Sequence, residues 1–126
     1  MKTEFSTTWK SSKKPSKQRK YRYNAPLHIK QKFVKAHLAK ELKTRYKKRS
    51  LRVRKGDTIK IMRGQFKKKT GKVERVDVKN AKIYITGIAI TKKDGSKRPC
   101  AVHPSNLLIT ELNLEDKKRQ KGLMGK

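Results

Sequence analysis

Hydrophobic positions change their spacing near residue 55, so the two halves of the chain predict different structures. Between residues 27 and 46 they recur every three or four residues, as on one face of a helix, with lysines on the other face. The tripeptide at 24–26, NAP, is typical of a helix start because Asn can cap and Pro suits the first turn. We expect one helix here, or two helices that break at Ala36–His37.

From residue 55 onward, apolar and polar residues alternate, which indicates short half-buried strands. The alternating pairs are Ile59 and Ile61, Val76 and Val78, Ile83 and Ile85, Ile88 and Ile90, and Leu107 and Ile109. The alternation slips between Val73 and Val76 and again across Gly87, where we expect bends or bulges. Turn signals at 63–64, 79–80 and 94–95 separate neighbouring strands.

These elements predict a mainly β protein: a small SH3-like barrel of about five antiparallel strands, preceded by a basic arm and one or two helices. An OB-type barrel is the alternative, but the strands are short for one. We divide the chain into an extended basic arm (1–23), a helical segment (24–48), the barrel (49–114) and a charged tail (115–126). Residues 47–55 form a basic linker, and the tail is expected to hold one helical turn followed by disorder.

Charge changes this picture, because 38 Lys and Arg stand against 9 Asp and Glu, a net charge of +29. Such a chain repels itself and requires a polyanionic partner, so part of it should stay unfolded until phosphates neutralise it. Residues 1–55 carry 20 of the basic and 2 of the acidic residues. The N-terminal part is therefore the stronger polyelectrolyte, and Tyr21 and Tyr23 around Arg22 are suited to stacking on unpaired bases.

Several classes of function are disfavoured by the residues themselves. The single Cys100 rules out an internal disulfide, and its C-x-x-H spacing to His103 lacks the second ligand pair that a zinc site needs. No apolar run is long enough to span a membrane, and the first residues do not form a signal peptide. Acids are scarce and nucleophile or phosphate-loop motifs are missing, so we expect no catalytic residues, no cofactor and no small-molecule substrate.

The stretch KGDTIKIMRG at 55–64, followed by TGKV at 70–73, resembles a KOW motif. That motif is shared by ribosomal proteins and by transcription elongation factors of the NusG and Spt-five type. The flanks are more specific: YNAPLHI at 23–29, KEL at 40–42, RSLRVRKGD at 49–57 and HPSN at 103–106. Together they resemble the universal large-subunit ribosomal protein L twenty-four family, in its archaeal and eukaryotic form, over about residues 17–116. The ending LLITELNLED at 107–116 is more similar to archaeal members.

The resemblance implies a structural constituent of the large ribosomal subunit. Its partners would be ribosomal RNA, near the start of the large-subunit RNA, and neighbouring large-subunit proteins, in the cytoplasm. It would contribute to early assembly and lie near the exit of the peptide tunnel, without membrane insertion and without forming homo-oligomers. The alternative, a transcription KOW module that binds polymerase and nascent RNA, predicts a NusG-type domain and a milder charge, neither of which this chain has.

The candidate RNA-binding residues come from the arm, the helical segment, the linker, the glycine-flanked loop and the polar turn. They are Lys13, Lys14, Lys17, Arg19, Lys20, Tyr21, Arg22, Tyr23, Asn24, His28, Lys32, Arg49, Arg52, Arg54, Lys55, Arg63, Gly64, Lys67, Lys68, Lys69, Gly71, Lys72, His103, Ser105 and Asn106. Glycines let backbone amides approach phosphate oxygens, but hairpin turns use glycine for their own geometry as well. His28 is equally compatible with a surface imidazole, and the turn at 103–106 with a structural role. Lys68 departs from the family pattern, which commonly has glycine there.

Overall fold

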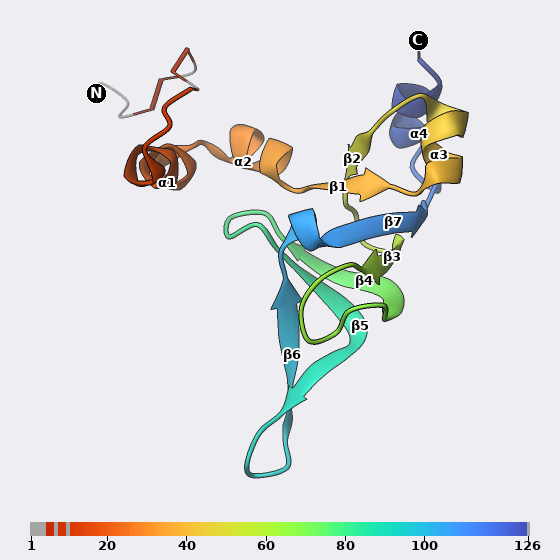
Figure 1. Cartoon of the computed structure of the whole chain (residues 1–126). Coiled ribbons are helices and arrows are strands. Elements are labelled where there is room, and N and C mark those ends of the chain that lie inside the picture. Colours follow the sequence, from red (N-terminus) through yellow and green to blue (C-terminus); the bar gives the residue numbers. More distant parts are fainter. Residues whose placement is uncertain (1–4, 7, 10, 126) are drawn as a thin grey trace.

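Seven strands of the described chain form one curled sheet in the order β2-β1-β7-β3-β4-β5-β6 (Figure 1). The computed structural model describes residues 5–6, 8–9 and 11–125. The strands are β1 (Lys35–Leu38), β2 (Ser50–Arg52), β3 (Thr58–Ile61), β4 (Thr70–Asp77), β5 (Lys82–Thr91), β6 (Lys97–Val102) and β7 (Leu107–Glu111). The helices are α1 (Pro15–Asn24), α2 (Leu27–Phe33), α3 (Lys40–Tyr46) and α4 (Lys117–Met124), with a 3-10 turn η1 (Pro104–Asn106).

The core is built from the alternating apolar residues of the strands. Ile59, Ile61, Ile83, Leu107 and Ile109 are all buried and belong to one cluster inside the sheet. Burying one such side chain contributes about 1.5–3 kcal/mol to stability. The predicted mainly β, small barrel-like fold is confirmed, and the alternation from residue 55 onward is what specifies it.

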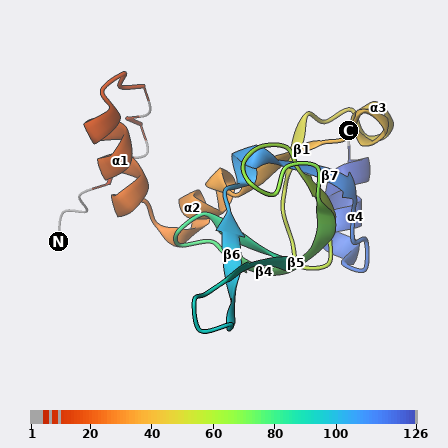
Figure 2. The ribbon, with the colours of Figure 1, turned by 60° about the horizontal axis from the view of Figure 1, so that its bottom comes forward.

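Two predicted irregularities of the sheet are also confirmed. The register between β4 and β5 shifts between Val73 and Arg75, and that between β5 and β6 shifts between Tyr84 and Ala89. Gly87 lies inside the second shift with a φ of 83°, a conformation that glycine adopts without strain. The bend lets one long strand, β5, carry both isoleucine pairs, and its hairpin with β6 projects away from the sheet (Figures 1 and 2).

The helical segment predicted over 24–48 is wrong in its middle. The break at Ala36–His37 is there, but it is the strand β1, which lies between α2 and α3 and has alternating exposed and buried residues. β1 pairs with β7 in parallel and with β2 antiparallel, so the expected linker contains a strand as well. Pairing with strands distant in sequence overrode the local helical spacing. This raises the strand number from about five to seven.

The arm predicted to be extended over 1–23 contains the ten-residue helix α1. Pro15 occupies its first turn, a position where proline favours a helix. The ring of Tyr21 packs against the rings of Phe5, Trp9 and Phe33, with centroid distances of 4.9, 6.0 and 6.1 Å. This aromatic cluster gives the arm an apolar contact that its composition did not suggest. Asn24 ends α1, and α2 begins after Pro26 with no side-chain cap.

The tail over 115–126 is also more ordered than predicted, since α4 is eight residues long. Asp116 caps it by accepting a hydrogen bond from the Lys118 N–H, at 2.8 Å. Arg119 and Leu123 are buried against the rest of the protein. Figure 1 shows α4 beside α3, and the Lys48 ammonium, just after α3, donates to the carbonyl oxygen of Gly122.

Candidate nucleic-acid interface

All the candidate cationic side chains are exposed. These are Lys13, Lys14, Lys17, Arg19, Lys20, Arg22, Lys32, Arg49, Arg52, Arg54, Lys55, Arg63, Lys67, Lys68, Lys69 and Lys72. Within the described part of the chain the ion pairs are Arg54–Asp116 and Arg119–Asp57. Of the candidate cations, only Arg54 therefore has an acidic partner there. The others present uncompensated charge to solvent, where phosphates can neutralise it.

The β3–β4 loop presents its lysines on a fixed frame. The Lys68 N–H donates to the Ile61 carbonyl at 2.8 Å, and the Lys67 N–H to the Gly64 carbonyl at 3.2 Å. Phe66 packs against the core, and the Lys69 ammonium lies 5.1 Å from its ring centroid. Anchored by one apolar side chain, the loop keeps its charged side chains outside.

Backbone geometry distinguishes the positions of this loop. Lys68 has a φ of 72° and Gly64 a φ of 96°, so both occupy the left-handed region, which a lysine adopts only at a cost. Gly71 has a different requirement: a Cβ there would lie 2.7 Å from Ile85 Cγ2 and 2.8 Å from the Thr86 carbonyl oxygen. Gly64 is thus explained by its turn and Gly71 by close packing of β4 on β5. A contact of either glycine with RNA stays a prediction.

The η1 turn lies against the start of the β3–β4 loop, because the Met62 N–H donates to the Asn106 carbonyl at 2.8 Å. His103 Nδ1 accepts from the Ser105 N–H at 3.2 Å and contacts Ser105 Oγ at 2.7 Å. An accepting Nδ1 leaves the proton of a neutral ring on Nε2. Since His103 and Ser105 are exposed, the turn and the loop form one surface, which we call the loop–turn surface (residues 62–69 and 103–106).

The two tyrosines of the arm are not equivalent. Tyr21 is half-buried in the aromatic cluster, whereas Tyr23 is 82% exposed. Arg22 lies with its guanidinium carbon 5.9 Å from the Phe33 ring centroid. His28 and Lys32 are exposed on α2. Tyr23 is therefore the aromatic residue of the arm best placed to stack on a base, while Tyr21 holds the arm together.

The segment from Arg49 to Lys55 contacts α2 and the residue before α4 through its arginine side chains. The Arg52 guanidinium donates to Gln31 Oε1 at 3.2 Å, which connects β2 with α2. The Arg54 guanidinium pairs with Asp116, and this hydrogen bond is the main cause that lowers the pKa of the Asp116 carboxyl. The predicted residues are thus divided between the arm, the loop–turn surface and this third region.

Comparison with known proteins decides the family. The sequence model for the ribosomal proteins called L26 in eukaryotes, together with their archaeal L twenty-four counterparts, matches residues 12–126. The chain belongs to this family. It is 49% identical over 110 residues to the large ribosomal subunit protein uL24 of Methanothrix thermoacetophila, covering 87% of this chain and 95% of the relative. It is 48% identical over 114 residues to the protein of the same name from Methanospirillum hungatei, covering 90% and 95%.

The family match extends beyond the region in which the sequence motifs were recognised, and it includes α4. No helix of the described residues is long and apolar enough to cross a membrane. In that same part of the chain, no group of three or more His, Cys, Asp or Glu is arranged to hold a metal ion. Membership in a family of ribosomal proteins agrees with the uncompensated charge found on the exposed side chains.

The sequence did not single out Asp57 or Arg119, which form a buried ion pair. Asp57 is a fully buried residue of the KOW motif, and the Arg119 guanidinium reaches it from the tail through two hydrogen bonds, of 2.6 and 2.7 Å. A buried acid in so basic a chain was the only signal available. It could not be recognised because the partner of Asp57 lies on a helix of which the sequence predicted only one turn.

Proposed function

We propose that this protein is a constituent of the large ribosomal subunit that binds ribosomal RNA near the start of the large-subunit RNA. It contributes to early subunit assembly and lies near the exit of the peptide tunnel, in the cytoplasm. The proposal is supported by the family and by relatives named large ribosomal subunit protein uL24. The observation that carries RNA binding is that the candidate cations are all exposed and almost all lack an acidic partner within the described chain.

The proposed mechanism is multivalent neutralisation of phosphates by preformed surfaces. The loop–turn surface supplies Lys67, Lys68 and Lys69 from a loop fixed by backbone hydrogen bonds. The arm adds the exposed cations of α1 and Tyr23. Because each phosphate contact releases condensed counterions, many modest contacts sum to tight, salt-dependent binding. Contacts on several sides of the protein favour a folded RNA that surrounds it over a single duplex.

Crosslinking in cells followed by sequencing of the attached RNA tests this function. We expect crosslinks concentrated near the start of the large ribosomal RNA, and co-sedimentation of the protein with the large subunit. Reads scattered over messenger RNA would contradict the proposal and favour a transcription-associated role. Depletion of the protein should also cause early precursors of the large subunit to accumulate in sucrose gradients.

A further inference from the structure

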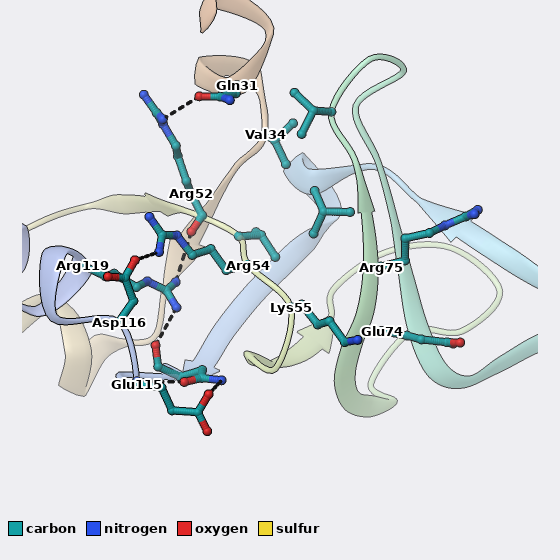
Figure 3. A pocket seen from close by; sticks show the side chains of 14 residues that line it. Gln31, Val34, Arg52, Arg54, Lys55, Glu74, Arg75, Glu115, Asp116 and Arg119 are labelled. Atoms are coloured by element: carbon teal, nitrogen blue, oxygen red, sulfur yellow. Dashed lines mark hydrogen bonds and ion pairs between the residues drawn. The ribbon is translucent and has the colours of Figure 1, made fainter. Parts of the chain in front are cut away.

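A cleft of about 850 Å³ is lined by residues that do not belong to the loop–turn surface (Figure 3). One wall is the β2–β3 connection at 52–55, and the opposite wall is β4 with the residues that follow it, 74–78. Val34 closes one end, and the segment 113–119 leading into α4 lies along the side. Its walls come from segments far apart in the sequence, so the cleft is a product of the tertiary structure.

Four valines form the apolar part of the cleft, and its other lining residues are polar or charged. Val34 and Val53 are buried at 2% and 5% exposure and belong to the core cluster, while Val76 and Val78 are half-buried and pack against it. Figure 3 shows Val34 directed toward the strand that faces it. These β-branched side chains are held by the core and have little rotamer freedom. Val76 and Val78 provide the accessible part of this preformed surface, which is suited to a flat apolar group.

Charge in the cleft is close to balance, unlike the charge of the chain as a whole. Arg54 pairs with Asp116, and Arg119 with the buried Asp57. Arg75 stacks over the ring of Tyr84, with its guanidinium carbon 4.3 Å from the ring centroid. The remaining lining cations, Arg52 and Lys55, are exposed, and the ion pairs of the described residues include neither Glu74 nor Glu115, which also line the cleft. A phosphate therefore gains little inside, and a neutral group is favoured there.

The rim differs from the interior, because the chain that leads into the cleft is strongly basic. Residues 47–55 include six Lys or Arg, and Arg49, Arg52 and Lys55 are exposed. Phosphates held by this rim would leave their attached base next to the valine surface. We propose that the cleft receives an unpaired nucleobase of the bound RNA, an inference that rests on the proposed RNA-binding function. The backbone stays on the basic rim and the base contacts the valines.

The polar groups beside the valines give this site a base preference. The carboxylate oxygens of Glu74 and Glu115 accept hydrogen bonds. Adenine, cytosine and guanine offer exocyclic amino groups to such acceptors. Uracil offers only its ring N3–H, which lies between two carbonyl oxygens that repel a carboxylate. The Glu115 carboxylate is positioned by Asn113, whose Nδ2 donates to Glu115 Oε2 at 3.3 Å and whose Oδ1 accepts from the Glu115 N–H at 3.0 Å. The cleft should therefore disfavour uracil.

Methyl NMR on the full-length protein tests the assignment, with oligo(C), oligo(U) and a base-paired RNA of equal length as probes. Oligo(C) should shift the methyl signals of Val76 and Val78 and bind about five-fold more tightly than oligo(U), the ratio expected for one stronger hydrogen bond. The base-paired RNA should shift the backbone signals of the basic loops and leave these methyl signals unshifted. Equal methyl shifts by all three RNAs, or none by oligo(C), would overturn the proposal.

Substitutions separate the cleft from general RNA binding. Val78→Phe fills the cleft and should abolish the preference for oligo(C), whereas Ile90→Phe places the same ring on the exposed β5–β6 hairpin and should leave it unchanged. Glu115→Gln should reduce the preference without disturbing the valine methyls of the free protein. If the protein binds ribosomal RNA but the Val78→Phe variant keeps the base preference, the cleft is not the base-binding site. The proposed function would not be affected by that result. Larger methyl shifts with a basic, leucine-containing peptide than with oligo(C) would instead identify a protein-docking site and overturn it.

Discussion

The guanidinium of Arg119 and the carboxylate of Asp57 form a buried, two-pronged ion pair between residues 62 positions apart. Nη1 donates to Oδ1 at 2.6 Å and Nη2 to Oδ2 at 2.7 Å. The same carboxylate accepts from the N–H groups of Arg54 and Asn113, each at 2.9 Å. Arg119 also donates to the carbonyl oxygens of Asn113 and Arg52, at 2.8 and 3.2 Å. The pair thus joins the KOW motif, β2 and the C-terminal helix in one network.

Arg119→Ala should destabilise the fold strongly. It leaves the Asp57 carboxylate buried without its counter-ion, a loss that typically costs about 3–5 kcal/mol in the free energy of unfolding. Denaturant unfolding measures the change. Arg54→Ala is the matched control, because its pair with Asp116 is exposed and screened by solvent. Equal decreases in the free energy of unfolding of the two variants would show that Arg119 is not the anchor of α4.

Lys68→Gly should raise or preserve stability while it weakens RNA binding. Glycine adopts the φ of 72° without a Cβ clash, and relief of that strain is worth up to about 1 kcal/mol after the entropic cost of glycine. Lys68→Ala removes the same charge and keeps the strain, so it should weaken binding equally without the gain in stability. Unfolding midpoints that do not separate the two variants would argue against strain at this position.

Gly71→Ala should destabilise the barrel by about 1–3 kcal/mol through overpacking. The added methyl would lie within 3 Å of both Ile85 Cγ2 and the Thr86 carbonyl oxygen. Gly122→Ala is the matched control, because no atom lies within 4 Å of its ideal Cβ and it is inside α4. There alanine favours the helix by about 1 kcal/mol. Thermal unfolding of the two variants should therefore shift in opposite directions.

RNA affinity should fall steeply with salt, since binding is driven by neutralised phosphates. A plot of the logarithm of the affinity against the logarithm of the salt concentration should become shallower by about 0.7–0.9 for each phosphate contact removed. The triple change of Lys67, Lys68 and Lys69 to Ala reports on the β3–β4 loop. Replacing Lys92 and Lys93 on the β5–β6 hairpin provides a charge-loss comparison. A slope near zero in the unchanged protein would contradict electrostatic binding.

Removal of residues 1–24 should weaken RNA binding and leave the barrel folded. No residue of α1 is buried, and the core cluster consists of side chains from Val34 onward. The far-ultraviolet circular dichroism of the strands should persist, while affinity for ribosomal RNA falls. Loss of the strand signal would show that the arm is part of the folding unit.

The alternation of apolar residues was enough to predict the barrel, its two irregularities and its turns. Apolar residues alternate with polar ones along any strand that has one buried face, so this pattern can be read from the local sequence of a small β protein. The departure of Lys68 from a family pattern that commonly has glycine left the backbone there open, and the structure gives it a φ of 72°. Those successes concern segments whose structure is set by neighbours along the chain.

Tertiary contacts decided the rest. Lys35–Leu38 became a strand because β7 and β2 lie beside it, α1 gained an aromatic cluster through Tyr21, and the tail became a helix because Arg119 reached Asp57. Each depends on residues far apart in sequence, which no local period reports. By itself the sequence determined a basic, barrel-forming chain of a recognisable family. The division of its cations among separate surfaces, and the cleft between β4 and the tail, arose only when long-range pairing and burial fixed those segments in space.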